Sequence, residues 1–138
     1  MDNTAAVLAM YEALNARDLS RLDDILAPDV AFHVSHLPAP VGREEIKADM
    51  ARYFSAFPDM ALTVADLVVD GDRVAARIVA RGTHDGTFGA MEPTGRSIDV
   101  TETDFLRMAG GKVAEAWVLY DQFTLLTQLG VLPDLATA

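Results

Sequence analysis

The apolar residues of this chain change their spacing once, near Pro58, and this change constrains the fold more than any other feature. Before Pro58 they recur every three or four residues, as in amphipathic helices, and after it they alternate with polar residues, as in β-strands. Long strands that follow a set of helices are typical of an α+β fold. We therefore expect the helices to pack on one face of a curved antiparallel sheet and to enclose a cone with an open mouth.

The same periodicity predicts where the elements lie. Apolar stripes predict helices over residues 4–14, 19–26 and 43–57, with a short strand over 29–36 after the second of them. Pro28 is expected to end the second helix and Pro58 the third. Period-two alternation predicts four further strands over residues 62–69, 73–84, 98–108 and 113–120, with a last helix over 122–129.

Composition excludes several classes of function. The 138 residues contain 11 Lys and Arg against 21 Asp and Glu, which gives a net charge of −10 and makes nucleic acid and membrane partners unfavourable. The chain has no cysteine, so zinc ribbons, iron–sulfur clusters and thiol nucleophiles are excluded. We expect residues 1–138 to form one domain, in a cytoplasmic protein without a metal site.

One face of the predicted strand 73–84 becomes smaller towards its end. It presents Ile78, Ala80 and Gly82 in turn, and His84 follows them. Small side chains beneath a helix layer leave space that larger ones would fill. This pattern predicts a cavity with His84 pointing into it.

The two faces of the predicted strand 113–120 are both apolar. One face carries Trp117 and leads to Asp121, and we expect it to line the cavity. The other face is formed by small and apolar side chains, namely Ala114, Ala116, Val118 and Tyr120. An apolar row that one subunit leaves uncovered favours a partner surface, so we expect a homodimer through this face.

The facing strand carries two carboxylates whose direction depends on the hairpin register. A four-residue loop over residues 109–112 would place Asp104 opposite Trp117 and Glu102 opposite Leu119. A three-residue loop would instead turn Thr101 and Thr103 inward. If Asp104 faces Asp121, their like charges couple, so that one of the two holds a proton near neutral pH.

Several short motifs carry a resemblance to a known family. They are Gly82-Thr-His84-x-Gly86, Pro93-Thr-Gly-Arg96, Leu106-Arg107 followed by Gly111-Lys112-Val113, and Trp117-x-x-x-Asp121 leading to Gln128-Leu129-Gly130. With this order of elements, the chain resembles the SnoaL-like polyketide cyclases of the nuclear transport factor 2-like superfamily. The resemblance implies a cone-shaped fold with a deep pocket, a dimer, no cofactor and an apolar small-molecule substrate.

The resemblance also implies roles for individual residues. Asp121 matches the carboxylate that acts as general acid and base in an intramolecular aldol ring closure, and His84 matches a position that faces the pocket. The chain departs from the family at Glu102 and Asp104, where the cyclases carry neutral or imidazole side chains. We expect Asp121, His84 and Asp104 to be catalytic. We expect the substrate to contact Glu102, Trp117, His33, Tyr11, Tyr53, Phe54 and Met91.

Other interpretations remain open at this stage. Asp121 stands directly before the last predicted helix and could serve only as its N-cap. Related cones open epoxides with two aspartates that flank an arginine, although Glu102 occupies the position where that arginine is expected. A third possibility is a binding module without catalysis, whose pocket only holds a ligand.

Overall fold

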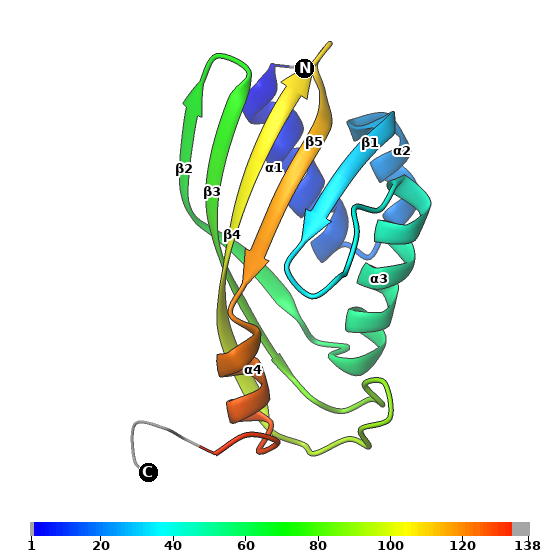
Figure 1. The fold of residues 1–138 in the computed structure, drawn as a ribbon, viewed down its shortest axis with the longest axis vertical. Coiled ribbons are helices and arrows are strands. Elements are labelled where there is room, and N and C mark those ends of the chain that lie inside the picture. The colour runs from blue at the N-terminus through cyan, green and yellow to red at the C-terminus, as the bar shows by residue number, and fades with distance from the viewer. Residues whose placement is uncertain (1, 134–138) are drawn as a thin grey trace.

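The structure of the protein, a computed structural model, describes residues 2–133. Helices and strands follow one another as the spacing of the apolar residues predicts (Figure 1). The elements are α1 (Asn3–Asn15), the 3-10 turn η1 (Leu19–Arg21), α2 (Leu22–Ile25), β1 (Leu26–Val34), α3 (Arg43–Ala56), β2 (Ala61–Asp70), β3 (Arg73–Thr83), β4 (Ser97–Ala109), β5 (Lys112–Tyr120) and α4 (Gln122–Gln128).

The five strands form one curved, open sheet in the order β1-β5-β4-β3-β2. The pairs β2–β3, β3–β4 and β4–β5 are antiparallel, whereas β1 pairs parallel with β5. Helix α1 packs on β2 and β5, α3 packs on β1, and α4 packs on β4. The expected α+β cone is therefore confirmed.

The second predicted helix is shorter than its apolar spacing suggests. Residues 19–21 form a 3-10 turn and residues 22–25 a single α-helical turn, after which β1 begins at Leu26. Pro28 lies inside β1, where the pairing with β5 is irregular between Leu26 and Ala31. A proline without an N–H is tolerated here because β1 is an edge strand.

A bulge in the β4–β5 hairpin decides which side chains face the helices. The strands are joined by a two-residue turn, Gly110-Gly111, and the pairing shifts after Met108 and Val113, so that Arg107 lies opposite Glu115. This shift leaves Ala114 as an extra residue in β5. Beyond the bulge, Ala116, Val118 and Tyr120 face the helices, which reverses the expected orientation of β5.

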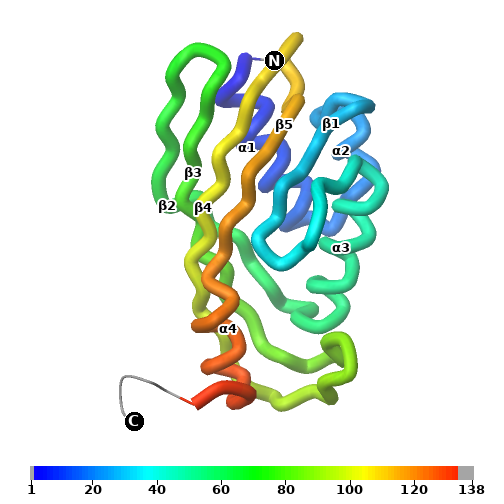
Figure 2. The backbone as a smooth tube through the Cα atoms, viewed as in Figure 1, coloured from blue at the N-terminus to red at the C-terminus, as the bar shows by residue number. Residues whose placement is uncertain are grey.

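Residues 84–96 connect β3 to β4 and pass close to the C-terminal end of α3. Figure 2 shows this yellow-green segment passing from the end of β3 beneath α3 and back to the start of β4. The segment is fastened to α3 at Gly86, whose N–H donates to the Ala56 carbonyl over 3.0 Å. A Cβ at this position would lie 2.0 Å from the Ser55 carbonyl oxygen, so only glycine fits.

Candidate functional site

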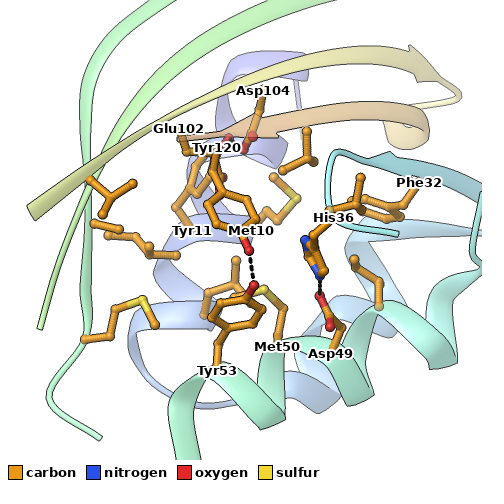
Figure 3. Close-up of a pocket in the computed structure, with 18 of the residues that line it drawn as sticks. Met10, Tyr11, Phe32, His36, Asp49, Met50, Tyr53, Glu102, Asp104 and Tyr120 are labelled. Atoms are coloured by element: carbon orange, nitrogen blue, oxygen red, sulfur yellow. Dashed lines mark hydrogen bonds and ion pairs between the residues drawn. The ribbon is translucent and has the colours of Figure 1, made fainter. Parts of the chain in front are cut away.

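A cavity of about 100 Å³ lies between the sheet, α1 and α3. Its walls are mostly apolar, and the few polar side chains on them gather in two groups on different elements (Figure 3). The lining residues are Met10, Tyr11, Leu14, Leu22, Leu26, Phe32, Val34, His36, Ile46, Asp49, Met50, Tyr53, Phe57, Met60, Leu62, Ala80, Ile98, Val100, Glu102, Asp104, Val118, Tyr120 and Leu125.

The first polar group consists of Glu102 and Asp104 on β4 with Tyr11 on α1. Alternation along β4 turns its even-numbered side chains towards the helices, and the register places Glu102 opposite Tyr120 and Asp104 opposite Val118. Asp104 is buried, and its Oδ2 accepts a hydrogen bond of 2.5 Å from the Tyr11 hydroxyl. Two carboxyl groups therefore share one apolar wall. The expected register was wrong in its partners, since it placed Asp104 opposite Trp117 and Glu102 opposite Leu119.

Burial and proximity raise the pKa of both carboxyl groups. The pKa of Glu102 lies well above its usual range because the group is removed from water and because Asp104 lies close by. Burial also raises the pKa of Asp104, although hydrogen bonds from Glu102 and Tyr11 limit the rise. Two like charges this close are unfavourable in an apolar site, so the pair holds a proton up to a higher pH than an isolated carboxyl group does.

The second polar group joins α3 to the loop after β1 and to the end of β5. His36 Nε2 lies 2.8 Å from Asp49 Oδ2, and the hydroxyl groups of Tyr53 and Tyr120 are hydrogen-bonded to each other. The rings of both tyrosines meet His36 edge-on, at centroid distances of 5.5 and 5.3 Å. Burial raises the pKa of both phenols, so they remain protonated and can donate hydrogen bonds.

Asp121 does not line this cavity, which corrects the expectation for the proposed base. It is exposed and caps α4, where its carboxylate accepts hydrogen bonds from the Thr124 N–H at 3.0 Å and the Thr124 hydroxyl at 2.6 Å. These bonds lower the pKa of Asp121. The bulge in β5 explains this position, because beyond it the side chains of Trp117, Leu119 and Asp121 point to the outer face of the sheet.

Trp117 and His33 also lie outside the cavity, on the outer face of the sheet. Their rings stack at a centroid distance of 5.2 Å and an angle of 7°. His33 Nε2 lies 2.8 Å from Glu115, which also pairs with Arg107. The row Ala114, Ala116, Val118 and Tyr120, expected to meet a second subunit, instead faces inward except at the bulged Ala114.

His84 is buried as predicted from its strand face, but it does not reach the cavity. Its Nδ1 lies 2.9 Å from the Thr94 hydroxyl and accepts from the Thr94 N–H at 3.2 Å. Its ring packs against Phe57, which occupies the cavity wall in its place. The catalytic position expected for His84 is therefore wrong, because the space left by Ala80 and Gly82 is partly filled from α3 and the segment after it.

The remaining expected wall residues divide into two pairs. Tyr11 and Tyr53 line the cavity. Phe54 is buried in the core on another side of α3, where the Arg17 guanidinium lies 3.9 Å from the centre of its ring. Met91 packs against the core from the segment 84–96 but does not line the cavity.

The sequence analysis did not place Asp49, His36 or Tyr120 in the cavity. A signal for Asp49 is present in the sequence, because Ile46, Asp49, Met50 and Tyr53 share one helical stripe and Asp49 is the only charged member. A carboxylate within an apolar stripe predicts a buried partner. No comparable signal exists for His36, which follows the end of β1 in an irregular loop.

The two polar groups give the cavity the parts that acid–base chemistry needs. One wall holds a carboxyl pair whose pKa values are raised, and another holds an imidazole beside two neutral phenols. Within residues 2–133, His, Asp and Glu side chains nowhere gather in threes that could hold a metal ion. None of the helices in the same range is both long and apolar enough to cross a membrane.

Comparison with known proteins gives a consistent result. Residues 4–129 match the family described as SnoaL-like polyketide cyclase. IdmH from Streptomyces antibioticus, a candidate polyketide cyclase, is 37% identical with a TM-score of 0.85 over 95% of this chain and 100% of IdmH. AclR from Streptomyces galilaeus, a candidate hydroxylase, is 34% identical with a TM-score of 0.86 over 96% of this chain and 83% of AclR. No curated protein sequence matches the chain.

Proposed function

The chain belongs to the SnoaL-like polyketide cyclase family, and from this membership and the carboxyl pair in its cavity we propose that it catalyses an intramolecular aldol ring closure. The observation that carries the proposal is that Glu102 and the buried Asp104 line one wall beside Tyr11 in an otherwise apolar site. A buried carboxyl group that keeps its proton at neutral pH can donate it, or a hydrogen bond, to an oxygen that gains negative charge.

In the proposed reaction a base removes a proton from the carbon next to one carbonyl, and the C–H electron pair becomes the enolate. The enolate oxygen carries the charge, which a hydrogen bond from protonated Glu102 stabilises. The enolate carbon then attacks a second carbonyl carbon of the same molecule. A carbon–carbon bond forms, the carbonyl electron pair moves to oxygen, and this alkoxide takes up a proton to give the ring alcohol.

The cavity favours a neutral, mainly apolar substrate. Among the described residues no lysine or arginine lines it, and its carboxyl groups would repel a carboxylate or phosphate. The apolar side chains, by contrast, gain free energy when they bury hydrocarbon surface. A polyketide-like ketone or ester fits these walls better than a free acid.

The proposal can be tested with 2,6-heptanedione, a neutral diketone whose aldol closure gives 3-hydroxy-3-methylcyclohexanone. We expect the wild-type protein to accelerate this closure and Glu102→Gln to lower kcat by about 10²- to 10³-fold, because glutamine keeps the shape but has no acidic proton. Binding of the diketone, measured by NMR titration, should change little.

Gln122→Glu serves as a control that adds a carboxylate outside the cavity, in α4, and we expect it to leave turnover unchanged. Binding of the diketone to the wild-type protein without turnover would contradict the cyclase proposal and favour a binding module. Equal turnover by wild type and Glu102→Gln would contradict the role of the carboxyl pair.

The outer face of the sheet favours assembly into a homodimer, which we include in the proposal together with a cytoplasmic location. Phe105, Trp117 and Leu119 expose 42%, 36% and 66% of their surface on neighbouring strands. The same face carries the ion pairs among His33, Arg107 and Glu115, whose opposite charges can match a second copy. Burial of these aromatic and aliphatic side chains would provide the free energy of association.

A further inference from the structure

His36 lines the cavity and carries a buried ring nitrogen without a hydrogen-bond partner. Its side chain is 7% exposed and lies 2.8 Å from Asp49, whose side chain is 10% exposed. Asp49 Oδ1 in turn accepts a hydrogen bond of 3.1 Å from the Arg52 guanidinium, so both carboxylate oxygens have a partner. The second ring nitrogen, Nδ1, is buried and has no hydrogen-bond partner.

These contacts fix the tautomer of the neutral imidazole. An ionised carboxylate can only accept hydrogen bonds, so Nε2 must carry the proton that it donates to Asp49. The lone pair then lies on Nδ1. A lone pair that is buried, without a donor and on the wall of a cavity is free to accept a proton from a bound molecule.

From this arrangement we propose that His36 Nδ1 is the general base of the cavity and that Asp49 is its positioning residue. The assignment rests on the proposed function, since it supplies the base that the ring closure requires. Figure 3 shows His36 and Asp49 apart from the Glu102–Asp104 pair, with Tyr120 reaching towards Tyr53. Base and acid are thus carried by different walls, as two-point proton transfer on one substrate requires.

The other titratable groups on the cavity walls fit this step less well. Glu102 and Asp104 share one apolar wall and have raised pKa values, which suits the pair to the role of an acid. The Tyr11 hydroxyl donates to Asp104, and the hydroxyls of Tyr53 and Tyr120 are bound to each other and hold their protons. Asp49 is occupied by His36 and Arg52 on its two oxygens.

The tautomer is tested on the unmodified protein by ¹⁵N NMR of its histidines at neutral pH. We expect the His36 signals to show a protonated Nε2 and an unprotonated Nδ1, and Asp49→Asn to shift them towards a tautomer mixture. A proton on Nδ1 of the wild-type protein, in a neutral or a doubly protonated ring, would overturn the assignment.

Base strength is tested with 5-nitrobenzisoxazole, an apolar probe that needs only a base. Removal of its ring C–H proton sends the C–H electron pair into a nitrile and breaks the N–O bond, which leaves a coloured phenolate. We expect His36→Gln to lower the rate by about 10²- to 10⁴-fold and Asp49→Asn to lower it less. His33→Gln is the matched control, because His33 pairs with Glu115 at the same 2.8 Å but on the outer face.

The two probes separate the two proposals. Suppose that His36→Gln loses ring opening of 5-nitrobenzisoxazole and that the wild type fails to cyclise 2,6-heptanedione. This result would support His36 as the base and would contradict the proposed ring closure. Retained ring opening in a folded His36→Gln would overturn the base and leave the ring closure standing. If His36→Gln does not fold, the wild-type tautomer decides.

Discussion

Tyr11 donates its phenolic proton to Asp104 over 2.5 Å, and this bond joins the first helix to the fourth strand inside the cavity. It also lowers the pKa of Asp104 against the larger effect of burial, which raises it. A residue of α1 therefore influences the pKa of a carboxyl group on β4.

Tyr11→Phe removes this donor and should raise the pKa of Asp104 further. The change can be followed by ¹³C NMR of the side-chain carboxyl groups across a pH titration. Tyr53→Phe is the control, since its hydroxyl pairs with Tyr120 and not with a carboxylate. A titration curve for Asp104 that is the same in Tyr11→Phe and wild type would contradict this coupling.

Glu102→Gln should make stability less dependent on pH. Because the pKa of Glu102 is raised in the folded state, that state holds its proton more tightly than the unfolded chain does. The free energy of unfolding should thus fall as pH rises from the ordinary pKa of glutamate towards the raised one, by about 1.4 kcal/mol for each pKa unit of difference. Urea unfolding at a series of pH values should show this slope in the wild type and a smaller one in Glu102→Gln.

Asp121→Ala should lower the free energy of unfolding by about 1 kcal/mol, the usual cost of losing an N-cap side chain. Turnover of 2,6-heptanedione should be unaffected, because Asp121 is exposed and does not line the cavity. Thr124→Val, which removes the partner hydroxyl, should have a smaller effect of the same kind. A large loss of turnover with unchanged stability would return Asp121 to the catalytic role that the family resemblance implies.

Trp117→Lys should convert the proposed dimer to a monomer, because it places a charge in the middle of the apolar outer face. Light scattering of the wild type is expected to give twice the chain mass of 14.9 kDa, and the variant to give the single mass. Leu8→Lys, which changes an equally exposed apolar residue on α1, should remain a dimer. A wild-type protein of single-chain mass at micromolar concentration would contradict the dimer.

The fold was predictable because its long elements have strong periodicity. The stripe of Ile46, Met50, Tyr53 and Phe57 identifies α3, and the alternation from Arg73 to Thr83 identifies β3 and its buried face. Errors in the elements were confined to places where local geometry overrides spacing, such as the short α2.

The candidate site was less predictable because a single bulge at Ala114 sets the phase of β5. Both faces of that strand are apolar, so hydrophobicity could not decide between Trp117 and Tyr120 as the inward residue. The contact between His36 and Asp49 leaves no sequence pattern, since His36 lies near the start of the irregular loop after β1 and Asp49 lies on α3.

The segment between Gly86 and Gly95 is hydrogen-bonded at its ends, and in its middle the Phe88 ring packs against the rings of Tyr53 and Phe57, at centroid distances of 5.0 and 5.7 Å. Gly86 is bonded to Ala56, and at the other end the Gly95 N–H donates to the His84 carbonyl while the His84 N–H donates to the Arg96 carbonyl. No residue of this segment lines the cavity, but Tyr53 and Phe57 do. Sequence variation at Phe88 can therefore reshape the cavity wall indirectly, through the two rings that it supports.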